Sequence, residues 1–342
     1  MYYVGLDVHK KSIAYCVKQA DGGIVREGSV AARREDLSAW VASLPQPWTG
    51  AMEATLFSDW VYEHLTPFAA ALKMGHPSRM RAIATSKKKT DQIDARTICD
   101  LLRCDLLPPA YVMPPELRPL RRVLRYRNLL VRAGVQMQNK IAGLLLEMGV
   151  EYDTPQLHRK KYFGQLIKDQ EEKIPASARR LLAFSREQYE TLHRMELKLL
   201  RGLAQHPDIA ARVTRLMTIK GVGPVLALTW VLEVGPVERL GNLSRAISFC
   251  GVCSALRESA GKQARGPISK QRNVHLQTVL IEAAHLAPRW NPLLKDVKEK
   301  EIQHGHHNRA TLAVARKLVA FLMAADRGHQ PHPRPAQGAE AA

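Results

Sequence analysis

Residues 2–8 read YYVGLDV, an apolar run that predicts a strand and carries one carboxylate, Asp7, near its end. The apolar segment SIAYCVKQA follows, and then the tripeptide DGG at 21–23 and the segment IVREGSV. A DGG sequence between two such segments is typical of a β-hairpin turn. Helical patterns come next and end near Leu107-Pro108-Pro109, a natural boundary. We therefore expect residues 1–112 to form an α/β domain that opens with antiparallel strands.

Three further carboxylates accompany Asp7 in this first region. Glu53 follows a turn-like stretch, and Asp91 and Asp94 lie three residues apart in a helical pattern, so they share one face. Hard divalent cations such as Mg2+ need oxygen ligands, above all charged ones. Two such ions about 3.5 to 4 Å apart would clamp the attacking and leaving oxygens of a phosphodiester. We predict that these four carboxylates bind Mg2+, with Mn2+ as the alternative ion, and act in catalysis.

The alternative for each carboxylate is a structural role. Asp91 could cap a helix, and Asp94 could pair with Lys88 or Arg96. Carboxylates are scarce in this chain, with 32 Asp and Glu against 51 Lys and Arg. Their joint placement on predicted strand and helix supports a metal site, and the residues alone leave both roles open.

The formal charge of +19 favours polyanionic partners, and nucleic acid above all. An anionic membrane surface would require a basic amphipathic helix rich in aromatic residues, and aromatics make up 6% of the chain. No run approaches the roughly 20 apolar residues of a membrane span. The N-terminus lacks the order of a secretory signal, so we expect a cytoplasmic protein with reduced thiols. Cys250 and Cys253 have the spacing of metal ligands, but no second pair accompanies them, and no zinc is assigned.

Long helical patterns begin after Pro114. A heptad pattern from Leu117 to Met148 and a second helical pattern from Leu181 to Leu199 are joined by a polar segment. We expect a helical, coiled-coil assembly arm over residues 113–210 and a homo-oligomer, a dimer or a tetramer. Residues 211–325 are expected to form a mainly helical C-terminal domain. The Pro-, Gly- and Ala-rich tail, residues 326–342, is expected to be disordered.

Six arginines crowd fifteen residues of the first long helix, with no acid among them. A solvated helix face is the bland explanation, but the uncompensated charge favours contacts to a nucleic-acid backbone. The candidates are Arg118, Arg121, Arg122 and Arg125.

The segment IKGVGP lies between two helical patterns and suggests a helix-hairpin-helix. In such a motif the glycines let backbone amides approach a phosphate. Lys220, Gly221 and Gly223 are therefore further candidates for nucleic-acid binding. An ordinary tight turn between helices is the alternative.

A basic segment with small residues follows. It contains Ser259 with Ala260, Gly261 and Gly266. It also contains a set of cations that are further candidates for nucleic-acid binding: Arg257, Lys262, Arg265, Lys270 and Arg272. A hydroxyl surrounded by cations and backbone amides can attack a phosphate whose developing charge is stabilised. Serine is also a common turn former, so the residues alone leave both roles open for Ser259.

These blocks, in this order, resemble the DEDD transposases of the insertion-sequence one-ten family, the bridge-RNA-guided DNA recombinases. The matching segments are GLDVHKK, the glutamate-bearing MEAT segment, KKTDQIDAR, the GVGP hairpin and the SAGK, ISK and Asn273 block. They span nearly the whole chain.

The resemblance implies an N-terminal RuvC-like domain of RNase H type, with Mg2+ bound at the positions of Asp7, Glu53, Asp91 and Asp94. It implies a serine nucleophile at Ser259 in a C-terminal transposase domain, and carboxylates from one protomer serving the serine of another. Donor and target DNA and a structured noncoding bridge RNA are the implied partners. No nucleotide cofactor is expected, because a covalent intermediate conserves the bond energy.

The chain departs from the family pattern at three places. Ser254 stands where the family usually has proline, and Ala260 stands where a second glycine commonly follows the nucleophile. Lys270-Gln271-Arg272-Asn273 replaces the usual Lys-Arg-Gly-Asn. These changes bear on the backbone geometry of the serine segment and leave the four carboxylates untouched.

The resulting hypothesis is an RNA-guided transposase that cuts and rejoins DNA through a serine-phosphate intermediate. The first alternative is a metal-dependent junction resolvase, in which the carboxylates activate water and Ser259 is structural. The second alternative is a non-enzymatic nucleic-acid-binding scaffold that uses only its basic helices and hairpin.

Overall fold

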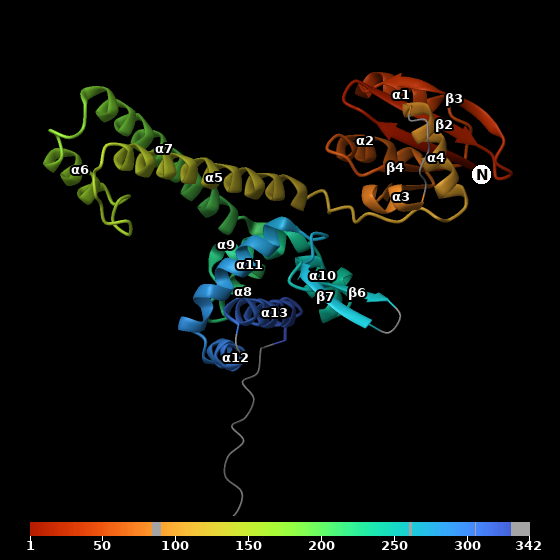
Figure 1. The fold of residues 1–342 in the computed structure, drawn as a ribbon. Coiled ribbons are helices and arrows are strands. Elements are labelled where there is room, and N and C mark those ends of the chain that lie inside the picture. The colour runs from red at the N-terminus through yellow and green to blue at the C-terminus, as the bar shows by residue number, and fades with distance from the viewer. Residues whose placement is uncertain (84–89, 260–261, 305, 330–342) are drawn as a thin grey trace, which may run out of the picture. The chain divides into compact units, whose positions relative to one another are not determined.

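The computed structural model describes residues 1–83, 90–259, 262–304 and 306–329 (Figure 1). The chain divides into two compact units, Met1–Val112 and Met113–Ala342, which are called unit 1 and unit 2. Each unit is described by itself below.

Unit 1 is built on a five-stranded sheet with the order β3-β2-β1-β4-β5. Its strands are β1 (Tyr2–Val8), β2 (Ser12–Lys18), β3 (Ile24–Ala31), β4 (Trp48–Glu53) and β5 (Ala71–Gly75). The first three strands are antiparallel neighbours, whereas β1, β4 and β5 run parallel. The predicted hairpin between β2 and β3 is confirmed, with Gly22 at a φ of 96°. This mixed sheet has the strand order of an RNase H-like domain.

Helices cover both faces of this sheet: α1 (Arg34–Ala42), α2 (Ser58–Leu65), the short 3-10 helix η1 (Thr66–Phe68), α3 (Pro77–Ile83) and α4 (Asp91–Arg103). Alternate residues of β1 point to opposite faces, as the strand period requires. Val4, Leu6 and Val8 join the core formed with α1 and α2. The other face packs against α4, where a Cβ on Gly5 would lie 2.1 Å from the Ala95 carbonyl oxygen. The glycine lets α4 approach closely, and Asp7 lies on this same face.

Unit 2 is mainly helical. Its elements are α5 (Leu117–Glu147), α6 (Lys160–Asp169), α7 (Ala176–Ala204), α8 (Pro207–Met217), α9 (Pro224–Val234), η2 (Val237–Leu240), α10 (Leu243–Cys250), β6 (Ser254–Ser259), β7 (Lys262–Ile268), α11 (Val274–Leu286), η3 (Ala287–Arg289), α12 (Pro292–Gln303) and α13 (His307–Asp326). The long helices α5 and α7 lie side by side (Figure 1). A core of apolar side chains gathers around α9.

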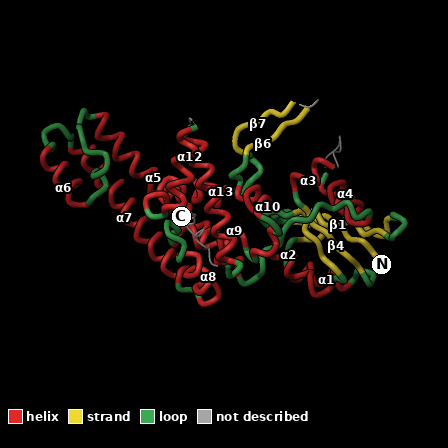
Figure 2. Tube along the Cα trace, turned by 90° about the horizontal axis from the view of Figure 1, so that it is seen from below, coloured by secondary structure: helices red, strands yellow, loops and turns green. Residues whose placement is uncertain are grey.

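Long helices and a helical C-terminal region are thus present as predicted, but two segments differ in detail. The segment around Ser259, predicted as a basic loop, is mostly an antiparallel hairpin of β6 and β7 (Figure 2). The tail predicted over 326–342 overlaps the end of α13 at Asp326, and residues 330–342 lie outside the described part. None of the described helices is both long and apolar enough for a membrane crossing.

Candidate functional site

The parallel pairing of β1 with β4 places two of the predicted ligands at one edge of the sheet. Leu6 pairs with Met52, so Asp7 and Glu53 each follow one residue beyond this pair at the carboxyl ends of neighbouring strands. Residues that pair in register point to the same face of a sheet. The register therefore directs Asp7 and Glu53 to the α4 face.

The other two predicted ligands belong to the first turn of α4. Thr90 is the N-cap, and its side-chain oxygen accepts a hydrogen bond from the Ile93 amide. Asp91 is therefore the first residue of the helix and not its cap, contrary to the structural alternative. Arg96 pairs with Glu27 through its Nε at 2.7 Å, while Lys88 lies outside the described residues. Acidic residues here also gain from the positive end of the helix dipole.

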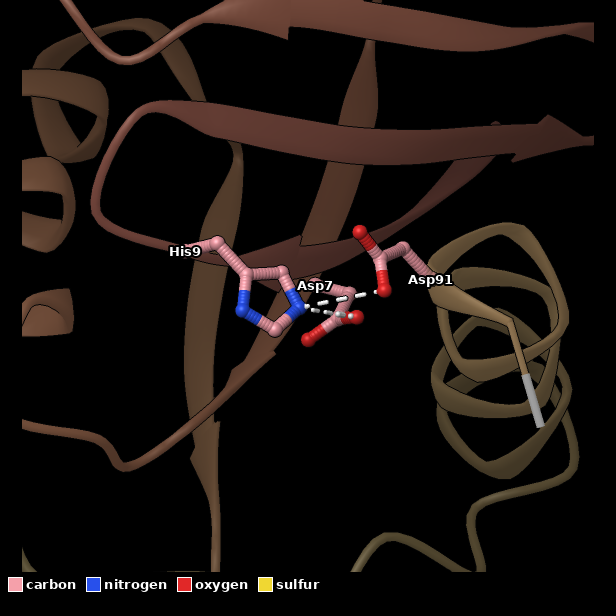
Figure 3. Close-up of side chains that lie close together, drawn as sticks. All are labelled: Asp7, His9 and Asp91. Carbon is pink, nitrogen blue, oxygen red and sulfur yellow. Dashed lines mark hydrogen bonds and ion pairs between the residues drawn. The ribbon is translucent and has the colours of Figure 1, made fainter.

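Asp7, His9 and Asp91 meet at this edge (Figure 3). The His9 Nε2 lies 2.9 Å from the Asp7 Oδ2 and 3.5 Å from the Asp91 Oδ1. The possible ligand atoms of these three residues all lie within 4.8 Å of one another. Among the described residues, Glu53 and Asp94 are outside this tight group, although Asp94 acts electrostatically on Asp7.

Burial and the neighbouring charges shift the pKa values of Asp7 and His9. Burial raises the pKa of the Asp7 carboxyl, the hydrogen bond from His9 opposes this rise, and the charges of Asp94 and Asp91 add to it. Burial alone would lower the pKa of the His9 imidazole, but its hydrogen bond to Asp7 and the surrounding carboxylates raise it. The imidazole thus lies between two carboxylates, in a place that favours positive charge.

A divalent cation fits this donor set. Asp7 is 7% exposed, and within the described residues no Lys or Arg pairs with it, so its negative charge is compensated only by His9. Burying a charge without a partner is costly, and carboxylate oxygens are the ligands that Mg2+ prefers. Asp7 and Asp91 would hold the ion.

His9 is the residue that the sequence analysis missed. It lies two positions after Asp7, and a spacing of two puts side chains on the same face at the end of a strand. This spacing was the available indication, but an isolated histidine in a basic segment carries little information about chemistry.

Similarity to known proteins extends over most of the chain. A family model for DEDD transposases matches residues 4–149, and a second, "Transposase IS116/IS110/IS902 family", matches residues 213–299. A "Probable family 20 transposase" of Pseudomonas aeruginosa is 25% identical over 330 residues, which cover 94% of this chain and 95% of the relative. The transposase for insertion sequence element IS1111A of Coxiella burnetii is 24% identical, over 94% of this chain and 88% of the relative.

The chain belongs to the IS110/IS116/IS902 family of transposases. It is a DNA strand transfer enzyme with a DEDD domain at its N-terminus, and such a domain implies a divalent metal. The cluster of Asp7, His9 and Asp91 lies in the part of the chain that the DEDD family model matches.

The arginines of this transposase's first long helix have different surroundings. Arg118 is buried, and its Nε donates to the Met113 carbonyl oxygen. Arg125 forms two hydrogen bonds of 2.8 Å with Glu233, which belongs to α9. Arg121 is half-buried and Arg122 is exposed. The acids that compensate this helix come from other helices, which a search along the sequence of α5 alone could not find.

The hairpin between α8 and α9 forms a tight turn in the transposase. Gly221 has a φ of 92°, and a Cβ at this position would lie 2.6 Å from the Ala287 Cβ. Asn291 donates its Nδ2 to the Lys220 carbonyl oxygen at 3.0 Å. Gly223 is the N-cap of α9 and has open space around it. Gly221 thus has a packing role, while the backbone at Gly223 is accessible.

Ser259 is the last residue of β6 and pairs through the backbone with Lys262 of β7. Ala260 and Gly261, between them, lie outside the described residues. The backbone of Arg257 is in β6 and that of Arg265 is in β7. Lys270 is exposed, and Arg272 donates to the Ser269 carbonyl oxygen at the base of the hairpin. The predicted nucleophile therefore stands at the far end of a two-stranded hairpin.

Proposed function

We propose that this transposase is an RNA-guided, site-specific DNA recombinase that cuts and rejoins DNA through a phosphoserine intermediate at Ser259. The observation that supports the metal-dependent half of the proposal is the meeting of Asp7 and Asp91 at the edge of the sheet. The position of Ser259 at the end of the β6–β7 hairpin supports the other half, because a hairpin end can enter a DNA groove.

In the proposed reaction, the Ser259 hydroxyl oxygen attacks a backbone phosphorus. A bond from the serine oxygen to phosphorus forms as the bond from phosphorus to the 3' oxygen breaks. The serine hydroxyl loses one proton, and the leaving 3' oxygen gains one to become a hydroxyl. A divalent cation held by the carboxylates would supply Lewis-acid polarisation of the phosphate and stabilise the leaving oxygen. Reversal of the attack by another 3' hydroxyl rejoins the strands and restores the serine.

The chain's own carboxylates have a defined task in this proposal. Asp7 and Asp91 hold negative charge at a fixed place, and Glu53 and Asp94 add to it from the next strand and the same helix turn. His9 compensates the charge of Asp7 through its contact of 2.9 Å, and Asp7 and Asp91 would hold the cation.

The organisation of unit 2 supports the same proposal. We assign α5, α6 and α7 to an assembly arm over residues 113–210, and α9 to α13 with the β6–β7 hairpin to a transposase domain over 211–325; α8 crosses the boundary between them. Leu129, Val135, Phe184 and Met195 are exposed apolar residues of the arm, which suits association with a second copy in a dimer or tetramer. Carboxylates of one protomer would then serve Ser259 of another, while a bridge RNA selects donor and target DNA. Arg122, Lys220 and the backbone at Gly223 are assigned to nucleic-acid contacts.

The test is a search for a protein-linked DNA strand. Purified protein, Mg2+, the noncoding RNA flanking its gene and labelled donor and target DNA are incubated and separated by denaturing electrophoresis. We expect an adduct that requires RNA and disappears in Ser259→Ala, but persists in Ser248→Ala, which removes an exposed serine hydroxyl of the same unit. An adduct retained by Ser259→Ala contradicts the assignment of the nucleophile.

The same experiment separates the two alternatives. Cleavage without any adduct would assign the carboxylates to hydrolysis, as in a junction resolvase, and make Ser259 a hairpin residue. If Asp7→Ala gives the same adduct and the same cleavage products as the unmodified protein, the carboxylates have no catalytic role, and the protein is a nucleic-acid-binding scaffold.

A further inference from the structure

A cavity of about 320 Å³ lies in unit 2, at the base of the β6–β7 hairpin. It is lined by residues of three elements: Ser254, Glu301, Arg309, Leu312 and Arg316. Its volume is at the lower end of the range, roughly 300 to 1,000 Å³, of pockets that hold small organic ligands. A single water has a share of roughly 30 Å³ in the liquid, so the cavity has room for much more than a bridging water.

One face of α13 supplies most of this lining. Arg309, Leu312 and Arg316 follow at spacings of three and four residues, so they lie on the same side of the helix. Two guanidinium groups with an apolar side chain between them form a surface suited to a ligand with an anionic part and an apolar part. Ser254, the first residue of β6, adds a hydroxyl to the wall.

The two arginines are held by different partners. Arg316 donates its Nε to the Val252 carbonyl oxygen at 2.8 Å, and among the described residues its two Nη groups have no hydrogen-bond partner. Arg309 is 67% exposed on its side chain, and its Nε lies 3.9 Å from the Glu301 Oε2. That distance is too long for a strong ion pair, so Glu301 orients Arg309 and leaves most of its donors available to a ligand.

We propose that this cavity binds a nucleotide of a DNA strand, with its phosphate on Arg309 and Arg316 and its sugar or base against Leu312. Planar guanidinium groups bind phosphate oxygens through paired hydrogen bonds, which favours arginine at such a site. The neighbouring hairpin supports a DNA strand as the occupant. It begins at Ser254, on the wall of the cavity, and its two β-strands include three more cationic residues, Arg257, Lys262 and Arg265, for the phosphates of adjoining nucleotides. The proposal rests on the DNA strand transfer activity of the family and does not depend on Ser259.

The test measures binding of a short labelled single-stranded DNA to the full-length protein by fluorescence anisotropy over a series of salt concentrations. We expect Arg309→Ala to weaken binding by about tenfold and to reduce the salt slope by about 0.7, the value for one lost phosphate contact on a single strand. Arg316→Lys keeps the charge but loses the paired donors, so a loss of several-fold is expected. Thermal melting checks that both variants remain folded.

Arg180→Ala is the matched control, because it removes one exposed arginine from α7, away from the cavity. It should change affinity by less than about twofold, the effect of a single exposed charge. Equal effects of Arg309→Ala and Arg180→Ala would overturn the proposal, since the cavity would then contribute only net charge. If Arg309→Ala loses binding to an RNA of the same sequence but keeps its binding to DNA, the assignment to DNA is overturned. Ser259→Ala must retain DNA binding, which separates this test from that of the nucleophile.

Discussion

Asp7 in unit 1 and Glu233 in unit 2 are both buried carboxylates, with 7% and 2% of their surface exposed, yet their surroundings are opposite. Glu233 accepts two hydrogen bonds from Arg125 and one of 2.9 Å from the Asn273 amide. Burial alone would raise the pKa of the Glu233 carboxyl, but Arg125, with Asn273 and His275, holds it below the ordinary value. The pKa of Asp7 is instead raised.

The difference separates a structural carboxylate from a chemical one. Arg125 neutralises Glu233, and Asn273 ties it to the N-cap of α11, so this carboxylate joins three helices. Asp7 has a histidine and two more acids around it, an arrangement that a cation would complete. In a chain with an excess of Lys and Arg, a buried acid without a lysine or arginine partner among the described residues indicates function better than burial alone.

The largest expected effect is the loss of activity in Asp7→Asn. The amide keeps the shape but removes the charge that would hold the metal, so strand transfer should fall by at least about a hundredfold. Stability should not fall, because the variant also removes a poorly compensated buried charge. The measurements are a strand transfer assay with Mg2+ and thermal melting of the same preparations. Full activity in Asp7→Asn would contradict the assigned role.

A second expectation concerns metal binding without catalysis. Mg2+ should stabilise the folded protein by about 2.7 kcal/mol when its concentration is 100 times the dissociation constant. Differential scanning fluorimetry with increasing Mg2+ should show a rising melting temperature for the unmodified protein and a much smaller rise for Asp91→Asn. Asp36→Asn, in the first turn of α1 on the other face of the sheet, is the control and should respond like the unmodified protein. Identical melting curves for Asp91→Asn and Asp36→Asn would contradict the role of Asp91 as a metal ligand.

The smallest effect is expected at the structural carboxylate. Glu233→Gln should lower the free energy of unfolding by about 2 kcal/mol, because the charged hydrogen bonds with Arg125 are lost while the Asn273 contact can persist. Glu299→Gln, which removes an exposed pair with Lys295, should cost less than about 0.5 kcal/mol. Chemical denaturation of the full chain measures both.

The pH dependence sharpens this third prediction. Since the folded-state pKa of Glu233 is lowered, its contribution is present above the ordinary glutamate range and is lost as the pH falls through the folded-state value. The difference in unfolding free energy between the unmodified protein and Glu233→Gln should therefore shrink as the medium becomes acidic. A difference that grows on acidification would show that Arg125 does not stabilise the charged form.

Local patterns were sufficient for the elements and the family. The apolar run at residues 2–8, the DGG turn and the helix that begins at Asp91 were all predicted, because strand and helix periods and turn chemistry act over a few neighbouring residues. The five matching segments pointed to the same class of enzyme as the strand order that the structure shows. The strand form of the segment at Ser259 was not predicted, since its composition of small and basic residues is equally typical of a loop.

Contacts between distant segments required the folded chain. His9 meets Asp91 across more than eighty positions of sequence because β1, which His9 follows, packs closely against α4. Arg125, which lacks any acid near it in the sequence, finds Glu233 on another helix. Charge compensation and burial depend on what lies beside a side chain in space, and this is why the pattern of residues located the carboxylates while only their packing distinguished Asp7 from Glu233.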